Sequence, residues 1–167
     1  MKKLIVCVLI LSLLLSCGTG AAAVEHPDFD WQTAAREDAA ITHPHPVCGD
    51  ANVVFVHALL QAMQAGATPR GVYESALQFA AEQGLHPLVL VTLRQAEAER
   101  PVYDGKYIGW VLVALQSAFY QLLHASDFRS ALVDIVSSGG DTDTNAAIAG
   151  ALLAALYGED CIPRQWL

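Results

Sequence analysis

The sequence of 167 residues predicts a single all-α domain built as a helical bundle. Its composition is 54% hydrophobic, rich in Ala and Leu and poor in aromatic residues, which suits packed helices better than sheets. Apolar residues recur at helical spacing, and prolines or glycines separate the segments that carry them. No run of alternating apolar and polar residues indicates a strand, because Val89-Leu90-Val91 is too short.

The first 23 residues have the organisation of an export signal. Lys2 and Lys3 precede an apolar stretch, and small residues follow it. Two cleavage outcomes are open: Leu14-Leu15-Ser16-Cys17 resembles a lipobox, which would attach lipid to its cysteine, and Ala21-Ala22-Ala23 suits ordinary signal peptidase. An uncleaved anchor is disfavoured, since so short a stretch would not span a bilayer comfortably. We therefore expect an exported chain: periplasmic, secreted or anchored as a lipoprotein.

Residues 24–167 form the predicted folded part, and turn residues divide it. Two prolines in Thr42-His43-Pro44-His45-Pro46 end the first helix. Asp50 is the expected N-cap of the second helix, and Thr68 with Pro69 begins the third. Gly84 ends that helix, and Ser126 caps a later one. We expect helices at Trp31–Ile41, Ala51–Ala65, Gly71–Gln83, Leu88–Ala98, Ile108–His124, Phe128–Val136 and Ala146–Tyr157.

Charge and cysteine content exclude several classes of protein. The formal net charge is −8 and no basic cluster stands out beyond the first residues, so we expect no nucleic-acid partner. Only Cys48 and Cys161 follow the signal segment. An exported chain could oxidise that pair, but the sequence does not decide whether the two thiols meet. Neither belongs to a Cys-x-x-Cys arrangement, which argues against zinc.

The stretch from Ser137 to Asn145 carries the clearest chemistry. Two glycines precede Asp141, Asp143 and Thr144, whose oxygens suit a hard cation such as Mg²⁺. Residues two apart do not share a face of a helix, so both carboxylates can reach one ion only if the glycines form an irregular turn. The alternative is that Asp143 or Thr144 merely caps the next helix, and the spacing alone favours this cap.

The longer pattern resembles a known family. Gly-Gly-Asp-Thr-Asp-Thr-Asn-Ala-Ala-Ile-Ala-Gly-Ala-Leu, with Tyr157-Gly158 and Ile162-Pro163-x-x-Trp166, is similar to the ADP-ribosylglycohydrolase family, which includes ADP-ribosylarginine hydrolase and the dinitrogenase reductase-activating glycohydrolase. The resemblance implies an all-α enzyme with two Mg²⁺ ions that hydrolyses the bond between ADP-ribose and a modified side chain. It further implies Asp141, Asp143 and Thr144 as Mg²⁺ ligands, and ADP-ribose or an ADP-ribosylated protein as partner.

Two more segments resemble this family. Thr42-His43-Pro44 is similar to an element beside the substrate cleft, which implies that His43 contacts substrate; the alternative is a loop histidine packed between prolines. Gly109-Trp110-Val111 resembles the start of another family helix. The Trp110 indole could stack on adenine, although an aromatic on an apolar helix is more often core. We expect His57 to be a core histidine. No nucleophile set is identifiable, so the catalytic residues stay unassigned.

The resemblance covers residues 31–167 and corresponds to the C-terminal half of a family member. The acidic cluster of the other half, which supplies the remaining Mg²⁺ ligands, has no counterpart here, so we expect a truncated bundle with at most one side of the metal site. Apolar helix faces would then be exposed. Three readings stay open: an enzyme half completed by another chain, a non-catalytic ADP-ribose-binding module, and a gene remnant. The linkage cleaved, turnover by the chain alone and the oligomeric state are not decided.

Overall fold

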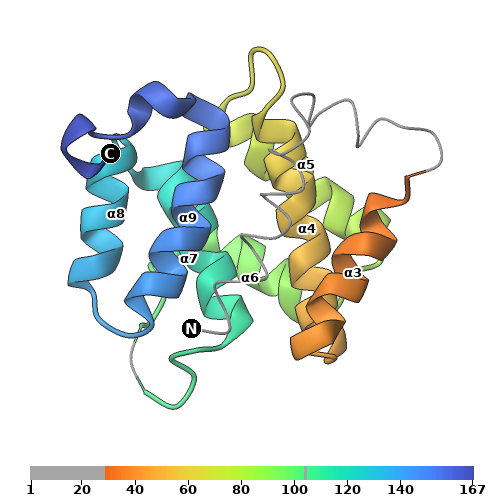
Figure 1. Ribbon diagram of the computed structural model, residues 1–167. Coiled ribbons are helices and arrows are strands. Elements are labelled where there is room, and N and C mark those ends of the chain that lie inside the picture. The colour runs from red at the N-terminus through yellow and green to blue at the C-terminus, as the bar shows by residue number, and fades with distance from the viewer. Residues whose placement is uncertain (1–28, 104) are drawn as a thin grey trace.

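The computed structural model describes residues 29–103 and 105–167, so the predicted signal segment, Cys17 included, lies outside the described residues. This part of the chain is all-α and contains no strand, as predicted (Figure 1). Its α-helices are α3 (Trp31–Thr42), α4 (Pro46–Ala62), α5 (Pro69–Glu82), α6 (Pro87–Ala98), α7 (Val111–His124), α8 (Phe128–Ser137) and α9 (Thr142–Tyr157). Two short 3₁₀ helices, η1 (Glu159–Cys161) and η2 (Arg164–Trp166), follow.

Three helices begin with proline. Proline has no backbone N–H, and the N–H of the first helical residue would have no partner within the helix. Thr68 caps α5 through its hydroxyl, as predicted, and Pro69 follows it. The expected start of α4 is wrong. Pro46 begins that helix and His45 caps it, because a proline that ends one helix can serve as the first residue of the next. Asp50 is therefore not a cap.

The carboxylate of Asp50 holds neighbouring elements together instead. It accepts a hydrogen bond from the Arg36 guanidinium of α3 and another, of 2.7 Å, from the backbone N–H of His86. His86 is the N-cap of α6. One partly buried acid thus joins α3 and α4 to the start of α6.

Two further helix starts differ from the expectation. Helix α7 begins at Val111 rather than Ile108, which leaves Trp110 at the N-cap position, outside the helix. Helix α8 is capped by Asp127, not Ser126: the Asp127 carboxylate accepts from the backbone of Ser130, and the Ser130 hydroxyl accepts from the backbone of Asp127. This reciprocal pair satisfies two N–H groups at once, which a single Ser cannot do.

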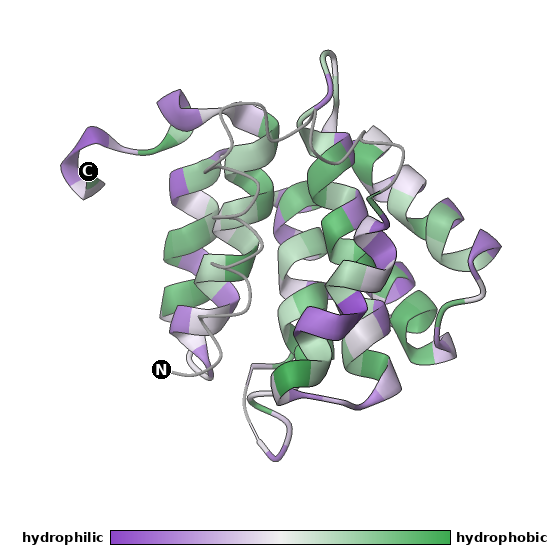
Figure 2. Ribbon diagram, turned by 45° about the vertical axis from the view of Figure 1, so that its right-hand side comes forward, coloured by the Kyte–Doolittle hydropathy of each residue, from purple (hydrophilic) through white to green (hydrophobic). Residues whose placement is uncertain are grey.

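Helix α9 lies between α8 and α4 and packs against both of them and against α7 (Figure 1). Figure 2 shows hydrophobic residues along the helices, with hydrophilic residues interspersed on them and in the connections. Small residues on α9 let α8 approach closely, since Leu132 lies opposite Gly150. Val133 and Val136 of α8 are exposed.

His57 and Cys48 lie in α4, and Cys161 lies in η1. His57 is half-buried, stacks on Phe79 and pairs with the Ser75 hydroxyl at 2.9 Å, as expected of a core histidine. Cys48 and Cys161 are both free thiols. Within the described residues, no helix has the length and apolar character needed to cross a membrane.

Candidate functional site

The glycine turn between α8 and α9 has the irregular geometry that the sequence predicts. Gly139 and Gly140 have φ angles of +79° and +78°, in the left-handed region that glycine adopts without strain. Asp141 is the N-cap residue, with a backbone conformation outside the helical region, and α9 begins at Thr142. Space around the two glycines differs: a Cβ on Gly139 would meet nothing, whereas one on Gly140 would overlap the carbonyl oxygen of Tyr103.

The segment before α7 holds this turn in place. The buried Tyr103 hydroxyl lies 2.9 Å from the Ser117 hydroxyl of α7, and burial raises the pKa of Tyr103. The Arg100 guanidinium donates to the Asp134 carboxylate of α8 at 2.6 Å and to the Ser138 hydroxyl at 2.5 Å. Since Ser138 immediately precedes the glycines, these contacts fix the backbone that delivers Asp141.

The polar residues after the turn do not act as a simple helix cap. Asp141 occupies the N-cap position of α9 but makes no side-chain capping hydrogen bond. Its carboxylate accepts instead from the Thr144 hydroxyl at 2.9 Å, so two of the predicted metal ligands are adjacent. Asp143 is exposed, and hydrogen bonds from the Thr144 backbone and with the Asp141 side chain lower its pKa. Neither Asp143 nor Thr144 is the cap that the alternative reading requires.

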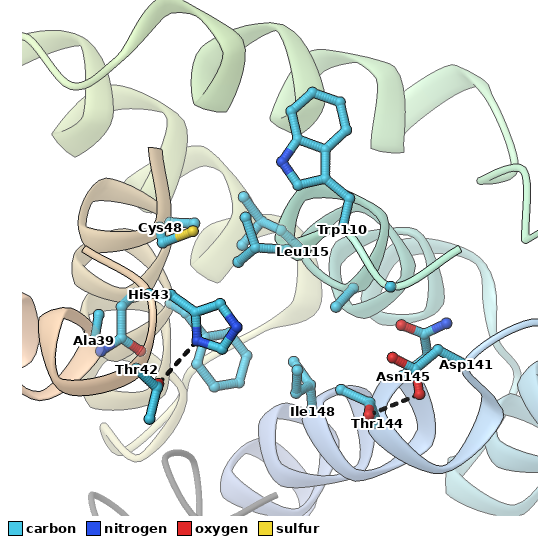
Figure 3. A pocket seen from close by; sticks show the side chains of 16 residues that line it. Ala39, Thr42, His43, Cys48, Trp110, Leu115, Asp141, Thr144, Asn145 and Ile148 are labelled. Atoms are coloured by element: carbon cyan, nitrogen blue, oxygen red, sulfur yellow. Dashed lines mark hydrogen bonds between the residues drawn. The ribbon is translucent and has the colours of Figure 1, made fainter. Parts of the chain in front are cut away.

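A pocket of about 190 Å³ opens beside this turn, between the C-terminus of α3 and the N-termini of α4, α7 and α9 (Figure 3). Four of the five sequence-predicted site residues line it: His43, Trp110, Asp141 and Thr144. Asp143 is not among the lining residues. The other lining residues are Ala39, Thr42, Cys48, Ala51, Asn52, Phe55, Gly109, Val111, Ala114, Leu115, Asn145 and Ile148. The pocket therefore has mainly apolar walls with polar groups at two ends.

His43 lies at one of these ends. It is exposed at the C-cap of α3, and its Nδ1 lies 2.8 Å from the Thr42 hydroxyl. If that hydroxyl donates, the neutral imidazole carries its proton on Nε2, where it can donate to a ligand oxygen. Figure 3 shows His43 across the pocket from Asp141 and Thr144. The histidine and the acidic turn, almost 100 positions apart in sequence, thus face one cavity.

Trp110 is not a core residue, contrary to the interpretation that helix position favoured. The residue is 39% exposed, because α7 begins one residue later and the indole lies outside the helix packing. The indole contacts the Tyr107 ring, with 5.4 Å between centroids. An exposed aromatic face at a pocket suits stacking with a planar ligand.

Asn145 is the site residue that sequence reasoning left without a role. It is only 2% exposed, and its Nδ2 has no hydrogen-bond partner among the residues that the structure describes. Leaving a buried amide unpaired costs about 1–3 kcal/mol. The available signal was its position four residues after Asp141, at the start of an apolar run. Cys48, also in the pocket lining, has a pKa raised by burial.

The site offers oxygen ligands for a metal ion. The Asp141 carboxylate and the Thr144 hydroxyl are hard oxygen ligands of the kind that Mg²⁺ prefers, and Asp143 is close by in the chain. Residues 29–103 and 105–167 contain no group of three or more His, Cys, Asp or Glu side chains arranged to hold a metal ion. The oxygens of Asp141 and Thr144 suit a divalent cation such as Mg²⁺.

The class of protein defined by the structure is an all-α fold with an acidic turn at the mouth of an apolar pocket. Comparisons with known proteins identify the family. Residues 12–167 match the sequence profile of the ADP-ribosylglycohydrolase family. The match begins inside the predicted export signal. A protein of Acanthamoeba polyphaga mimivirus that carries an ADP-ribosyl glycohydrolase name is 32% identical over 146 residues, covering 80% of this chain and 43% of that protein.

Two further matches agree. The ADP-ribosyl-[dinitrogen reductase] glycohydrolase of Rhodospirillum rubrum is 28% identical, with 87% of this chain and 45% of that protein covered. A solved structure titled ADP-ribosylglycohydrolase-related protein complex has a TM-score of 0.69 and 26% identity, over 84% of this chain and 47% of that one. The chain belongs to the ADP-ribosylglycohydrolase family. It spans less than half the length of these relatives.

Proposed function

We propose that this chain binds an ADP-ribose-like ligand in the pocket beside the glycine turn, with a divalent cation held at Asp141 and Thr144. One observation carries the proposal. Three segments distant in sequence bring His43, Trp110, Asp141 and Thr144 to a single cavity. Family membership gives the class of ligand, because the relatives are named as glycohydrolases that act on ADP-ribosylated targets.

The chain's own residues have distinct tasks in this proposal. The Trp110 face stacks on the planar base, and the apolar pocket walls exclude water around it. His43 donates from Nε2 to a ribose or phosphate oxygen. Asp141 and Thr144, with Asp143 as a third oxygen ligand from the rim, would hold Mg²⁺, which when bound supplies electrostatic activation of ligand oxygens.

Hydrolysis requires more than this set. We expect the chain alone to release ADP-ribose from ADP-ribosylarginine only slowly, because a site that fixes both attacking and leaving oxygens needs more ligands than Asp141, Asp143 and Thr144 provide. Binding without rapid turnover is therefore the activity expected of the chain by itself. A second chain that supplies further acidic ligands would raise turnover.

The test is thermal melting of the full chain with ADP-ribose and Mg²⁺, each alone and together. The wild type should melt at a higher temperature with both, since a ligand that binds only the folded state stabilises it. Asp141→Ala should remove this shift because the variant lacks the carboxylate at the pocket mouth. Asp160→Ala is the control, because its exposed acid lies in η1, beyond the opposite end of α9 and about 24 Å away at 1.5 Å per helical residue.

Equal shifts in the Asp141 and Asp160 variants would contradict the metal assignment. A wild-type chain whose melting does not respond to ADP-ribose with Mg²⁺ would contradict the proposed ligand. Fast release of ADP-ribose by the chain alone would show that the ligand set suffices for turnover.

A further inference from the structure

The buried face of α9 contains one polar residue. Asn145, Ala149, Leu152 and Leu153 lie on this face at helical spacing, and all four are buried. Three are apolar, and the fourth is an amide whose Nδ2 meets no acceptor in the described parts of the chain. Buried polar side chains nearly always have a partner, so this exception calls for one that the protein alone does not supply.

The position of Asn145 indicates where that partner lies. Its backbone N–H donates to the Asp141 carbonyl at 3.0 Å, which places the two residues one helical turn apart on the same side of α9. Asn145 lines the pocket with Asp141 and Thr144, and Figure 3 shows its amide group beside Asp141. The side chain that carries the unpaired Nδ2 is therefore part of the pocket wall.

The chemistry of the atom restricts the ligand. An amide Nδ2 carries two hydrogens and donates only, so its partner must be an acceptor and not a cation. Asp141 and Thr144 offer oxygens, which suit a cation or a donor. The two kinds of group lie side by side, so this wall of the pocket can contact a cation and a ligand oxygen together.

We propose that Asn145 is a binding residue whose Nδ2 donates a hydrogen bond to an oxygen of the bound ligand, a ribose hydroxyl or phosphate oxygen of an ADP-ribose-like molecule. The proposal rests on the proposed function for its ligand. It adds that a buried amide, and not only the acidic turn, selects an acceptor oxygen at this position.

The pocket contains a second asparagine that serves as an internal reference. Asn52 also lines the cavity, but its Nδ2 donates to the Ala35 carbonyl of α3 at 2.6 Å. Its amide thus has a structural partner within the chain. Replacing each asparagine by leucine, which has nearly the same shape, removes the donors without opening a large cavity.

The experiment measures melting and ADP-ribose affinity of the full chain in the presence of Mg²⁺. Without ligand, Asn145→Leu should melt at or above the wild-type temperature, because it removes an unpaired buried amide, whereas Asn52→Leu should melt lower. With ligand, Asn145→Leu should bind ADP-ribose about tenfold more weakly, the effect of one lost hydrogen bond. Repeating the titration with ADP locates the oxygen: a loss for both ligands places it in ADP, and a loss for ADP-ribose alone places it in the terminal ribose.

Two results would overturn the inference while the proposed function stands. In one, Asn145→Leu binds ADP-ribose as tightly as the wild type. In the other, the unliganded variant melts as low as Asn52→Leu, which would show that the amide is structural. Failure of the wild type to bind ADP-ribose would instead overturn the proposed function, and the inference with it.

Discussion

Two regions of the molecule use polar side chains in opposite ways. In the packed cluster of Trp31, His57 and Phe79, between α3, α4 and α5, the His57 ring lies 4.1 Å from the Phe79 ring at an interplanar angle of 7°. Its Nε2 is paired with the Ser75 hydroxyl. In the pocket, by contrast, His43 is exposed and the Asn145 amide is unpaired. Packing within the chain explains the contacts of His57. It does not explain the exposed ring of His43 or the unpaired amide of Asn145.

This contrast shows how a histidine in the fold can be interpreted. The sequence around His57 indicates only a core position, and the Thr42-His43-Pro44 resemblance leaves a loop histidine as the alternative for His43. The stacked ring and satisfied hydrogen bond mark His57 as structural, whereas His43 retains an exposed edge at a cavity. We expect stability and ligand binding to separate in the same way.

The largest effect should come from Gly140→Ala, which would displace the acidic turn and so disrupt the pocket region. The new Cβ would overlap the Tyr103 carbonyl in a conformation that already disfavours side chains, so we expect a loss of about 3 kcal/mol or more in unfolding free energy. Gly139→Ala has the same positive φ but open space around it, and should cost only about 1–2 kcal/mol. Urea unfolding of both variants measures the difference. Equal costs would mean that Tyr103 does not constrain the turn.

A medium effect should separate the two histidines. His57→Ala loses a ring stack and a hydrogen bond, and should lower the unfolding free energy by about 2 kcal/mol. His43→Ala removes an exposed side chain and should change it by less than about 0.5 kcal/mol. The two variants should rank in the opposite order when the melting shift caused by ADP-ribose with Mg²⁺ is measured. Only His43→Ala should reduce that shift. A large stability loss in His43→Ala would remove the distinction between the regions.

The smallest effect is a pH dependence in the packed cluster. Burial lowers the pKa of His57 below its usual 6.5, because it disfavours the charged imidazolium in the folded state. The unfolded chain then binds its proton at higher pH than the folded chain does. The stabilisation is complete above pH 6.5 and is lost as the pH falls through the folded-state pKa. His57→Gln should flatten this part of the stability profile in urea unfolding, and an unchanged profile would exclude His57 as its source.

Much of the fold could be predicted from the sequence because turn residues mark most helix ends. Thr68-Pro69 and Gly158 lie at the helix ends where their chemistry places them. Errors arose where one residue type has two uses. Pro46 both follows a break and begins a helix, and Asp127 competes with Ser126 for the same cap. Local sequence does not rank such alternatives, since tertiary contacts decide them.

The candidate site was predictable in its motifs but not in its assembly. The acidic turn and His43 were identified by pattern, and the cavity brings them together. The role of Asn145 needed the structure, because an unpaired donor is defined by what surrounds it in space. The exposure of Trp110 became evident only once the start of α7 was known. The position of Asp143 outside the pocket lining also required the structure, since spacing along the chain cannot show which side chain faces the pocket.

The contact between Gly140 and the Tyr103 carbonyl has a consequence for engineering and for evolution. The connection between α6 and α7 packs tightly against the turn between α8 and α9, although some 35 positions separate them. Insertions in the first should therefore be tolerated only with matching changes in the second. Anyone who transplants the acidic motif into another helical scaffold would have to carry both segments together.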